Sequence, residues 1–291
     1  MRQPKTIFLL GNGRSGTRFL CGLFQNNAAD CTAVHEPYVT ASRPSMFGIP
    51  IYDHTHGNHE RLRRAFERKA RGIRSYRTAW YAETSHAFIM SFADLAMEAF
   101  SDMKLVHVIR DPLKVCASQA ERETIIRRWR MPLRDYRADN GRRYFRWRLT
   151  GDEPVYQHFA GEQLSLFQIF LIQWIELENR AQQFLDRYQK RDECFVLHTP
   201  SDLNDALKVR AMFDFFGLGL KQPDVVLEGP RNRTPGGKRV ESNLEMDELR
   251  WVIDRLPAEY LEIFDSPPYN SFAWSKSLQK PQPQANSAIV A

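Results

Sequence analysis

The sequence predicts an α/β fold in which short apolar strands alternate with amphipathic helices. Three runs, at residues 7–10, 104–109 and 194–198, have the length and apolar character of buried strands, and each is followed by apolar residues at helical spacing. Strands that alternate with helices pair in parallel, because each helix carries the chain back to the start of the next strand. We therefore expect a parallel sheet flanked by helices.

The other elements follow in chain order. Residues 31–34 and 76–83 have strand character, and helical patterns cover residues 60–74, 87–100, 161–188 and 245–264. A further helix starts behind Pro200-Ser201-Asp202, runs to Phe216 and stops at Gly217. Residues 39–59 are rich in Pro, Gly, Ser and His, and we expect a long loop there.

Length and composition indicate one domain with a tail. The 291 residues, 43% of them hydrophobic, can bury the core of a domain that we place at residues 1–265. Residues 266–291 are rich in Pro, Ser and Gln, and we expect them to be partly disordered. The net charge of +6 should attract anionic ligands. The four cysteines form no C-x-x-C pair, which predicts neither a zinc site nor a disulfide framework.

A glycine-rich turn connects the first predicted strand to the first helix. Gly11, Gly13 and Gly16 permit backbone turns that a β-carbon would block, so that consecutive N–H groups can converge on one anion at the helix N-terminus. Arg14 and Arg18 add positive charge to this loop. Strand, loop and helix together predict a phosphate-binding site.

Three phosphate-loop patterns and a purely structural turn compete for this stretch. The nucleoside-triphosphate loop requires a lysine where this chain has Thr17. The dinucleotide fingerprint Gly-x-Gly-x-x-Gly is present, and Glu36 lies 20 residues after its last glycine, where an acid binds the ribose of NAD. The third pattern is Arg-Ser-Gly-Thr after a strand, which residues 14–17 match.

A second segment distinguishes between these patterns. The strand at residues 104–109 ends in Arg110-Asp111-Pro112, and Pro112 suits the first turn of the helix that follows. Ser118 lies eight residues after Arg110, two turns into that helix, so both side chains can point at one anion beside the first loop. The alternative is a surface arginine that pairs with Asp111.

Together, the Arg14-Ser15-Gly16-Thr17 loop and the pair of Arg110 and Ser118 resemble the nucleotide-binding motifs of sulfotransferases that use 3′-phosphoadenosine 5′-phosphosulfate (PAPS). The resemblance covers residues 6–120 with good motifs and residues 190–240 in outline. It implies a P-loop fold like that of nucleotide kinases, in three layers, with a central parallel sheet of about five strands flanked by helices. It also implies PAPS as cosubstrate, adenosine 3′,5′-bisphosphate (PAP) as product, and no metal.

The resemblance assigns the two ends of the nucleotide to the two motifs. The 5′-phosphosulfate would be held by Gly13, Arg14, Ser15, Gly16, Thr17 and Arg18, with Arg14 neutralising the leaving phosphate. Arg110 and Ser118 would hold the 3′-phosphate. A basic loop at residues 231–239 stands where the family closes over the nucleotide, which makes Arg231, Arg233 and Lys238 further candidate ligands.

Three side chains are candidates for the general base that takes the proton of the acceptor hydroxyl. Glu36 precedes Pro37, which favours extended geometry at the end of the second strand, and the family often carries a similar Glu-Pro. His35 can do the same work as a neutral imidazole. Glu83, at the end of the third predicted strand, is the remaining alternative, and His86, three residues later, could also reach the cleft. The competing interpretation is that Glu36 is a structural partner of a loop arginine.

Residues 121–160 form a basic and aromatic insert. Ten arginines stand between positions 122 and 148 against three acids, with tryptophan, tyrosine and phenylalanine among them. Such a mixture suits an acidic sugar, whose ring faces stack on aromatics while its anions pair with guanidinium groups, and it equally suits nucleic acid. We expect an acceptor-binding insert, with a solvated basic face as the alternative.

These observations predict a sulfotransferase that moves the sulfuryl group from PAPS to a hydroxyl of a carbohydrate or glycoconjugate, by in-line transfer with a carboxylate base. The alternatives are a P-loop nucleotide- or nucleic-acid-binding protein without this activity, and an NAD-binding dehydrogenase. The histidines near Asp53 do not have a standard zinc spacing. With no visible signal peptide or membrane-spanning stretch, we expect a cytoplasmic protein.

Overall fold

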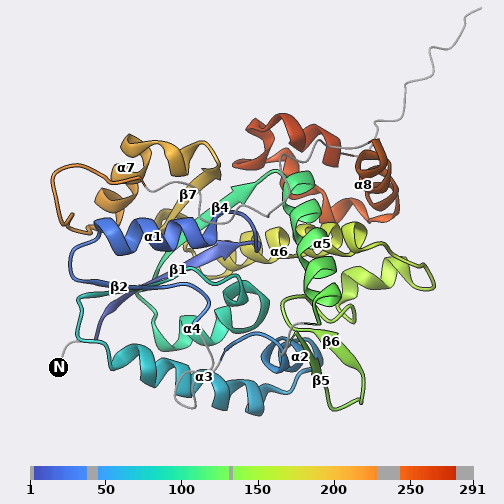
Figure 1. Ribbon diagram of the computed structural model, residues 1–291, viewed down its shortest axis with the longest axis horizontal. Coiled ribbons are helices and arrows are strands. Elements are labelled where there is room, and N and C mark those ends of the chain that lie inside the picture. The colour runs from blue at the N-terminus through green and yellow to red at the C-terminus, as the bar shows by residue number, and fades with distance from the viewer. Residues whose placement is uncertain (1–2, 38–44, 131–133, 228–242, 280–291) are drawn as a thin grey trace, which may run out of the picture.

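The computed structural model describes residues 3–37, 45–130, 134–227 and 243–279 (Figure 1). At its centre lies a sheet of five strands, β1 (Lys5–Gly11), β2 (Cys31–Val34), β3 (Trp80–Glu83), β4 (Lys104–Arg110) and β7 (Cys194–Thr199). They lie in the order β2-β3-β1-β4-β7, and every neighbouring pair is parallel. The predicted α/β class with a parallel five-stranded sheet is confirmed.

Helices connect and cover these strands. The α-helices are α1 (Thr17–Asn27), α2 (Ile49–His56), α3 (His59–Arg74), α4 (Ala93–Ala99), α5 (Pro112–Arg128), α6 (Leu166–Arg187), α7 (Ala206–Phe216) and α8 (Asn243–Arg255). A π-helical turn (Phe88–Phe92) leads into α4, and 3-10 turns cover Pro154–Phe159, Arg191–Glu193, Asp202–Asn204, Ala258–Tyr260, Glu262–Asp265, Tyr269–Ser271 and Ala273–Leu278. An antiparallel hairpin, β5 (Asp135–Arg137) and β6 (Arg143–Phe145), lies outside the main sheet. None of the helices in the described ranges is both long and apolar enough to cross a membrane.

The order of the strands places a ligand-binding position next to β1. From β1 the chain builds β2 and β3 on one side of the sheet and then crosses to β4 and β7 on the other side. In open parallel sheets, ligands bind beyond the carboxyl ends of the strands at such a switch point. Gly11 at the end of β1 lies in register with Val108 near the end of β4. The segments that follow β1 and β4 therefore start beside each other.

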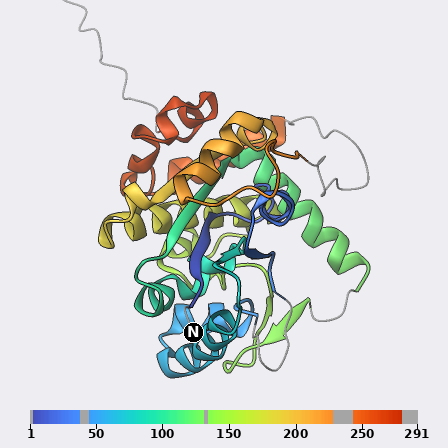
Figure 2. The ribbon, with the colours of Figure 1, turned by 90° about the vertical axis from the view of Figure 1, so that its left-hand side faces the viewer.

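Both faces of the sheet are buried. Ile7 and Leu9 of β1 belong to a hydrophobic cluster that includes residues of α1 and α7. Phe8 and Leu10 belong to the larger cluster, which includes residues of α4, α5 and α6. Figure 2 shows α1 and α6 on opposite sides of the strands. Alternate residues of one strand thus face two separate cores, as expected where helices cover both faces of a sheet.

The prediction that residues 39–59 form a loop is wrong for α2. Gly48 and Gly57 flank this helix with positive φ angles of 78° and 72°, and Pro50 lies in its first turn. These are ordinary residues for the ends of a helix. The buried residues of α2 are consecutive, at positions 50–53, so that no helical periodicity of apolar residues reveals it in the sequence.

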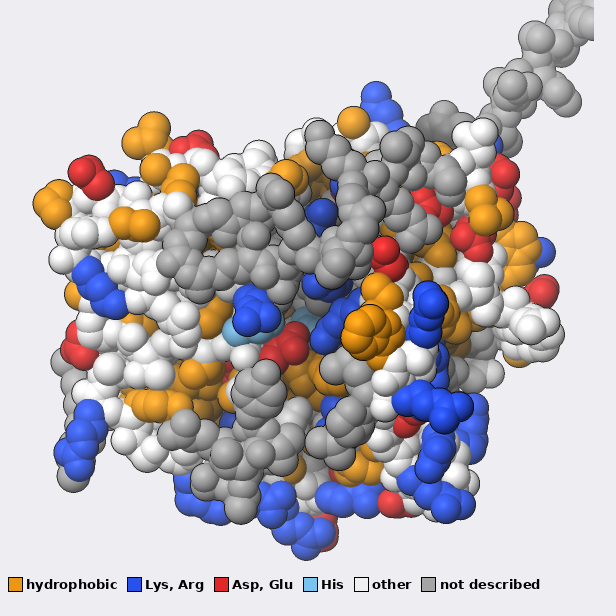
Figure 3. Space-filling model, in the orientation of Figure 1, with side chains coloured by type: hydrophobic (Ala, Val, Ile, Leu, Met, Phe, Trp, Pro, Cys, Tyr) orange, Lys and Arg blue, Asp and Glu red, His pale blue; other side chains and the backbone are white. Residues whose placement is uncertain are grey.

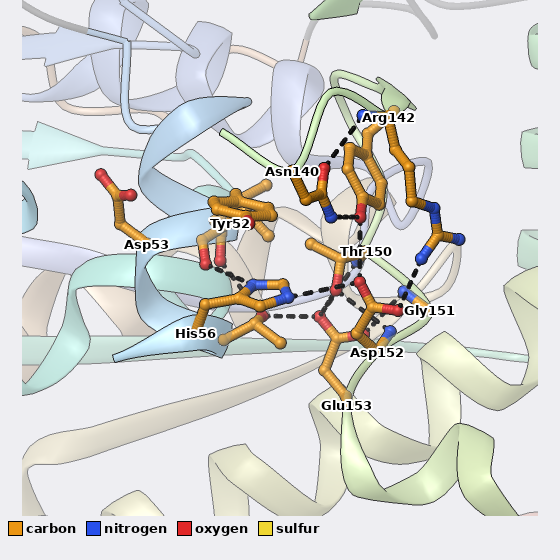
Figure 4. A network of polar contacts seen from close by, with 12 residues as sticks. Tyr52, Asp53, His56, Asn140, Arg142, Thr150, Gly151, Asp152 and Glu153 are labelled. Carbon is orange, nitrogen blue, oxygen red and sulfur yellow. Dashed lines mark hydrogen bonds and ion pairs between the residues drawn. The ribbon is translucent and has the colours of Figure 1, made fainter. Parts of the chain in front are cut away.

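A polar network holds the β5–β6 hairpin of the insert against α2 (Figure 4). The Asp152 carboxylate accepts a hydrogen bond from the Tyr144 hydroxyl at 3.0 Å and lies 3.3 Å from His56 Nε2. The Thr55 hydroxyl donates to Glu153 at 2.8 Å. Because Tyr144 belongs to β6 while His56 and Thr55 belong to α2, these bonds fix the insert to the body of the protein.

The C-terminal third departs from prediction at two points. Asp205 caps α7, in place of the predicted Ser201-Asp202, because its carboxylate accepts from the first free N–H groups of the helix. The predicted end of this helix at Gly217 is confirmed. The packed chain also continues past residue 265, since Tyr269 and Leu278 are buried in the larger cluster. Residues 280–291 of the predicted tail lie outside the described residues.

Candidate functional site

The loop between β1 and α1 is built from glycines that cannot be exchanged for larger residues. At Gly11, where φ is 138°, a β-carbon would come within 2.7 Å of the Val108 carbonyl oxygen of the neighbouring strand. At Gly16, where φ is 101°, it would come within 2.8 Å of the Leu203 side chain. Arg14 adopts a left-handed φ of 68°, which costs a non-glycine residue free energy. Such strain is characteristic of loops that present their backbone to a ligand.

The N-terminus of α1 opens towards this loop. No side chain caps the helix, and its first turn contains no acidic residue. The first N–H groups of a helix have no intrahelical acceptor and carry the positive end of the helix dipole. Ser15 and Thr17 are buried in the loop, and the Ser15 hydroxyl donates to the Asn12 carbonyl at 2.6 Å. The arrangement leaves backbone donors available to an anion.

The structure brings the two sequence motifs together. The Arg14 Nε donates a hydrogen bond to the Ser118 hydroxyl at 2.9 Å, although 104 residues separate them. The Arg110 guanidinium donates to the Arg14 carbonyl oxygen at 2.7 Å. Arg110 ends β4, and Ser118 lies two turns into α5, as the sequence predicted. The glycine-rich loop and the Arg110 segment thus form one cluster.

Positive charge from Arg14, Arg110 and Arg122 is concentrated at this site. Burial lowers the pKa of Arg14, and the charges of Arg122 and Arg110 lower it further. Burial also lowers the pKa of Arg110. The Arg110 Nε is buried and has no hydrogen-bond partner among the described residues. Arginines held close together with an unused donor are expected where an anionic ligand binds.

A carboxylate and two imidazoles lie beside the loop. Glu36 Oε1 is 3.0 Å from His86 Nδ1 and 3.8 Å from His35 Nε2. Burial would raise the pKa of Glu36, but the interaction with His86, aided by His35, outweighs burial and lowers the pKa to about 2. The His35 Nδ1 donates to the Thr84 carbonyl at 2.9 Å. Burial lowers the pKa of His35, so its ring is neutral at pH 7.

His86 lies between this carboxylate and the glycine-rich loop, in the cleft that the sequence suggested it could reach. A β-carbon on Gly13 would lie 3.2 Å from His86 Nε2 and 3.1 Å from Gln119 Nε2. One ring nitrogen of His86 therefore faces Glu36 and the other lies against the loop. The signal in the sequence is the position of His86, three residues after the end of β3, at the edge of the sheet where the other site residues lie.

The remaining predicted residues are placed as follows. Glu83 is buried, with its Oε2 2.6 Å from Lys69 Nζ and accepting from the Tyr81 hydroxyl at 2.6 Å, while its Oε1 accepts from Lys69 Nζ at 2.8 Å. Both carboxylate oxygens are thus occupied, which argues against Glu83 as the base. Arg18 is exposed on the first turn of α1. Arg231, Arg233 and Lys238 lie outside the described residues.

Figure 3 shows the face of the molecule that carries this site. Acidic and histidine side chains lie together in a central hollow, with lysine or arginine side chains beside them. Figure 3 also shows lysine and arginine gathered near the β5–β6 hairpin. In the described part of the chain, no group of three His, Cys, Asp or Glu residues is arranged to hold a metal ion.

The chain is similar to solved sulfotransferase structures. It is 18% identical to a sulfotransferase from Alicyclobacillus acidocaldarius, with a TM-score of 0.48, covering 89% of this chain and 96% of the other. It is 12% identical to the sulfotransferase domain from the curacin biosynthetic pathway, with a TM-score of 0.40, covering 96% of this chain and 97% of that domain. No protein-family model and no curated protein sequence matches the chain.

Proposed function

We propose that this protein transfers the sulfuryl group of PAPS to a hydroxyl group of an acceptor. The observation that carries the proposal is the pair of hydrogen bonds from Arg14 to Ser118 and from Arg110 to the Arg14 carbonyl. They join a phosphate loop and a second cationic cluster into one site beside an ionised carboxylate. A nucleotide with phosphates at both its 5′ and 3′ positions has the charge distribution that two such clusters fit.

The donor binds across the two clusters. The backbone N–H groups of residues 13–18 and the side chains of Arg14 and Thr17 hold the 5′-phosphosulfate at the N-terminus of α1. The guanidinium of Arg110, with its unused Nε, and the hydroxyl of Ser118 hold the 3′-phosphate. Binding an anion there relieves the repulsion between the arginines and offsets part of the free-energy cost of burying them.

Transfer proceeds in line. The acceptor oxygen attacks sulfur, the bond between sulfur and the 5′-phosphate oxygen breaks, and PAP leaves with the negative charge that develops on that oxygen. Such a transfer depends on alignment and on charge stabilisation at the leaving group more than on covalent catalysis by the protein. Arg14 and the first N–H groups of α1 supply that stabilisation.

We assign proton removal to Glu36 together with His86. A carboxylate with a pKa of about 2 is a weak base on its own. However, the Glu36 carboxylate lies 3.0 Å from His86 Nδ1 and therefore favours the tautomer with the proton on Nδ1, which leaves an electron pair on Nε2 next to Gly13. The acceptor proton then goes to His86 Nε2, and Glu36 stabilises the resulting imidazolium. Glu36 thus acts through His86, and His35 is the second candidate for the proton.

The insert provides a binding surface for a carbohydrate or other anionic acceptor. The Arg122 guanidinium lies 5.1 Å from the centre of the Trp147 ring, and no carboxylate pairs with Arg122 among the described residues. Arg122 also influences the pKa values of Arg14 and Glu36, which places its charge near the transfer site. An aromatic ring next to a free guanidinium suits a sugar ring that carries an acidic group.

Ligand binding separates this proposal from its alternatives. Thermal unfolding should be measured with PAP, ATP and NAD, because a ligand at 100 times its Kd stabilises the folded state by about 2.7 kcal/mol. We expect PAP to raise Tm the most. A larger effect of ATP would favour a nucleoside-triphosphate-binding protein, and a larger effect of NAD a dehydrogenase. Arg14→Ala should abolish the shift with PAP, while Arg64→Ala, which removes an exposed arginine of α3, should retain it.

A further inference from the structure

A buried carboxylate lies against the phosphate loop and is not part of the site described above. Glu178 of α6 is 1% exposed. Asn12 Nδ2 donates to its Oε1 at 2.9 Å, while His107 Nε2 at 2.9 Å and the Tyr269 hydroxyl at 2.7 Å donate to its Oε2. The donors belong to the loop after β1, to β4 and to the C-terminal 3-10 turns. One side chain therefore joins three distant segments of the chain.

Asn12 is the contact between this carboxylate and the loop. Its side chain is fully buried, and its amide nitrogen donates to Glu178. Its backbone carbonyl oxygen accepts from the Ser15 hydroxyl at 2.6 Å. Asn12 is thus held through both side chain and backbone, between Gly11 and Gly13. Because glycines leave the backbone around them free to turn, the fixing of Asn12 determines where the following N–H groups point.

The charge of Glu178 is a disadvantage at this position, but its two equivalent oxygens are an advantage. A negative charge near an anion-binding loop opposes anion binding, and burying a carboxylate costs free energy unless donors compensate it. A glutamine would avoid both disadvantages. However, a carboxylate can accept donors on both oxygens, whereas the amide of glutamine has one oxygen to offer to Asn12, His107 and Tyr269. The acid is therefore suited to fixing several segments at once.

We propose that Glu178 is a positioning residue of the phosphate loop. It fixes Asn12, and through Asn12 the N–H groups of residues 13–17, against β4 and the C-terminal segment. The part of the test that measures nucleotide affinity rests on the proposed function. The part that measures hydrogen exchange does not.

The test compares Glu178→Gln with Tyr269→Phe. Both variants weaken the same network, but Tyr269→Phe leaves the bond between Asn12 and Glu178 in place. Amide hydrogen exchange without nucleotide should become about tenfold faster at residues 13–17 in Glu178→Gln, and should change less than twofold there in Tyr269→Phe. In calorimetry, the Kd for PAP should rise about tenfold in Glu178→Gln and stay within twofold in Tyr269→Phe.

The sign of the affinity change separates positioning from simple electrostatics. If Glu178 acted on the loop only through its charge, Glu178→Gln would bind PAP more tightly. The proposal would be overturned if Glu178→Gln bound PAP as tightly as wild type or more tightly and showed unchanged hydrogen exchange at the loop. It would also be overturned if Tyr269→Phe changed exchange and affinity as much as Glu178→Gln does. If Glu178→Gln fails to fold, Asn12→Ala cuts the same bond from the loop and should give the same faster exchange. If the wild-type protein does not bind PAP, the proposed function fails, while exchange still decides the role of Glu178.

Discussion

Replacement of Arg110 by methionine tests the 3′-phosphate site in detail. The variant Arg110→Met keeps most of the buried aliphatic volume and removes the guanidinium. Two charge-assisted hydrogen bonds to a phosphate would be lost, each worth about 1.5 to 3 kcal/mol, so we expect the Kd for PAP to rise by at least about 100-fold. Because burial of Arg110 is itself unfavourable, Tm without ligand should change by no more than about 4 °C.

Adenosine 5′-monophosphate is the matched control ligand, since it lacks the 3′-phosphate. Arg110 also supports the loop through the Arg14 carbonyl, so Arg110→Met should weaken binding of the monophosphate as well, but by at least about tenfold less than binding of PAP. Isothermal titration calorimetry measures both affinities. Equal losses for the two ligands would show that Arg110 acts on the loop alone, and an unchanged Kd for PAP would refute the assignment of the 3′-phosphate site.

Three further predictions concern the carboxylates. Glu36→Gln should have a Kd for PAP within about threefold of wild type, but its kcat in an assay with labelled PAPS should be lower by about 100-fold or more. Full activity of this variant would remove Glu36 from the mechanism. The pKa of Glu36 falls from 4.5 to about 2 on folding, so its ionisation stabilises the protein above pH 4.5 by about 3 kcal/mol, and this contribution is lost as pH falls towards 2. Urea unfolding should show that Glu36→Gln lacks that pH-dependent contribution, and an unchanged dependence would contradict the low pKa. Lys69→Met should lower the free energy of unfolding by about 3 to 5 kcal/mol, because it leaves Glu83 unpaired in the core. The double variant Lys69→Met with Glu83→Leu should recover most of the lost stability. No loss in the single variant would show that Glu83 is free to act elsewhere.

Local sequence was sufficient to predict the central strands and the phosphate loop. Apolar runs of strand length, glycines and a following helical pattern specify β1, the loop and α1 within about 20 residues, and the same holds for β4 and α5. Their proximity follows from parallel pairing, which brings carboxyl ends to one edge. Helix α2 was missed because its consecutive buried residues lack periodicity.

The parts of the site that escaped prediction depend on contacts between distant residues. Glu83 looked like a free acid in the sequence, because nothing there shows that Lys69 of α3 folds back onto it. The position of His86 in the sequence indicated that it could reach the cleft, but nothing in the sequence shows that its ring lies between Glu36 and Gly13. The contact between Asn12 and Glu178 spans 166 residues and involves no motif at all.

A crystal structure of the protein with PAP tests the central claim most directly. We predict that the 5′-phosphate accepts from the N–H groups of residues 13–17 and the 3′-phosphate lies within hydrogen-bond distance of Arg110 and Ser118, with Glu36 and His86 facing the open side of the 5′-phosphate. A nucleotide bound elsewhere, or one whose 3′-phosphate faces away from Arg110, would contradict the proposed activity.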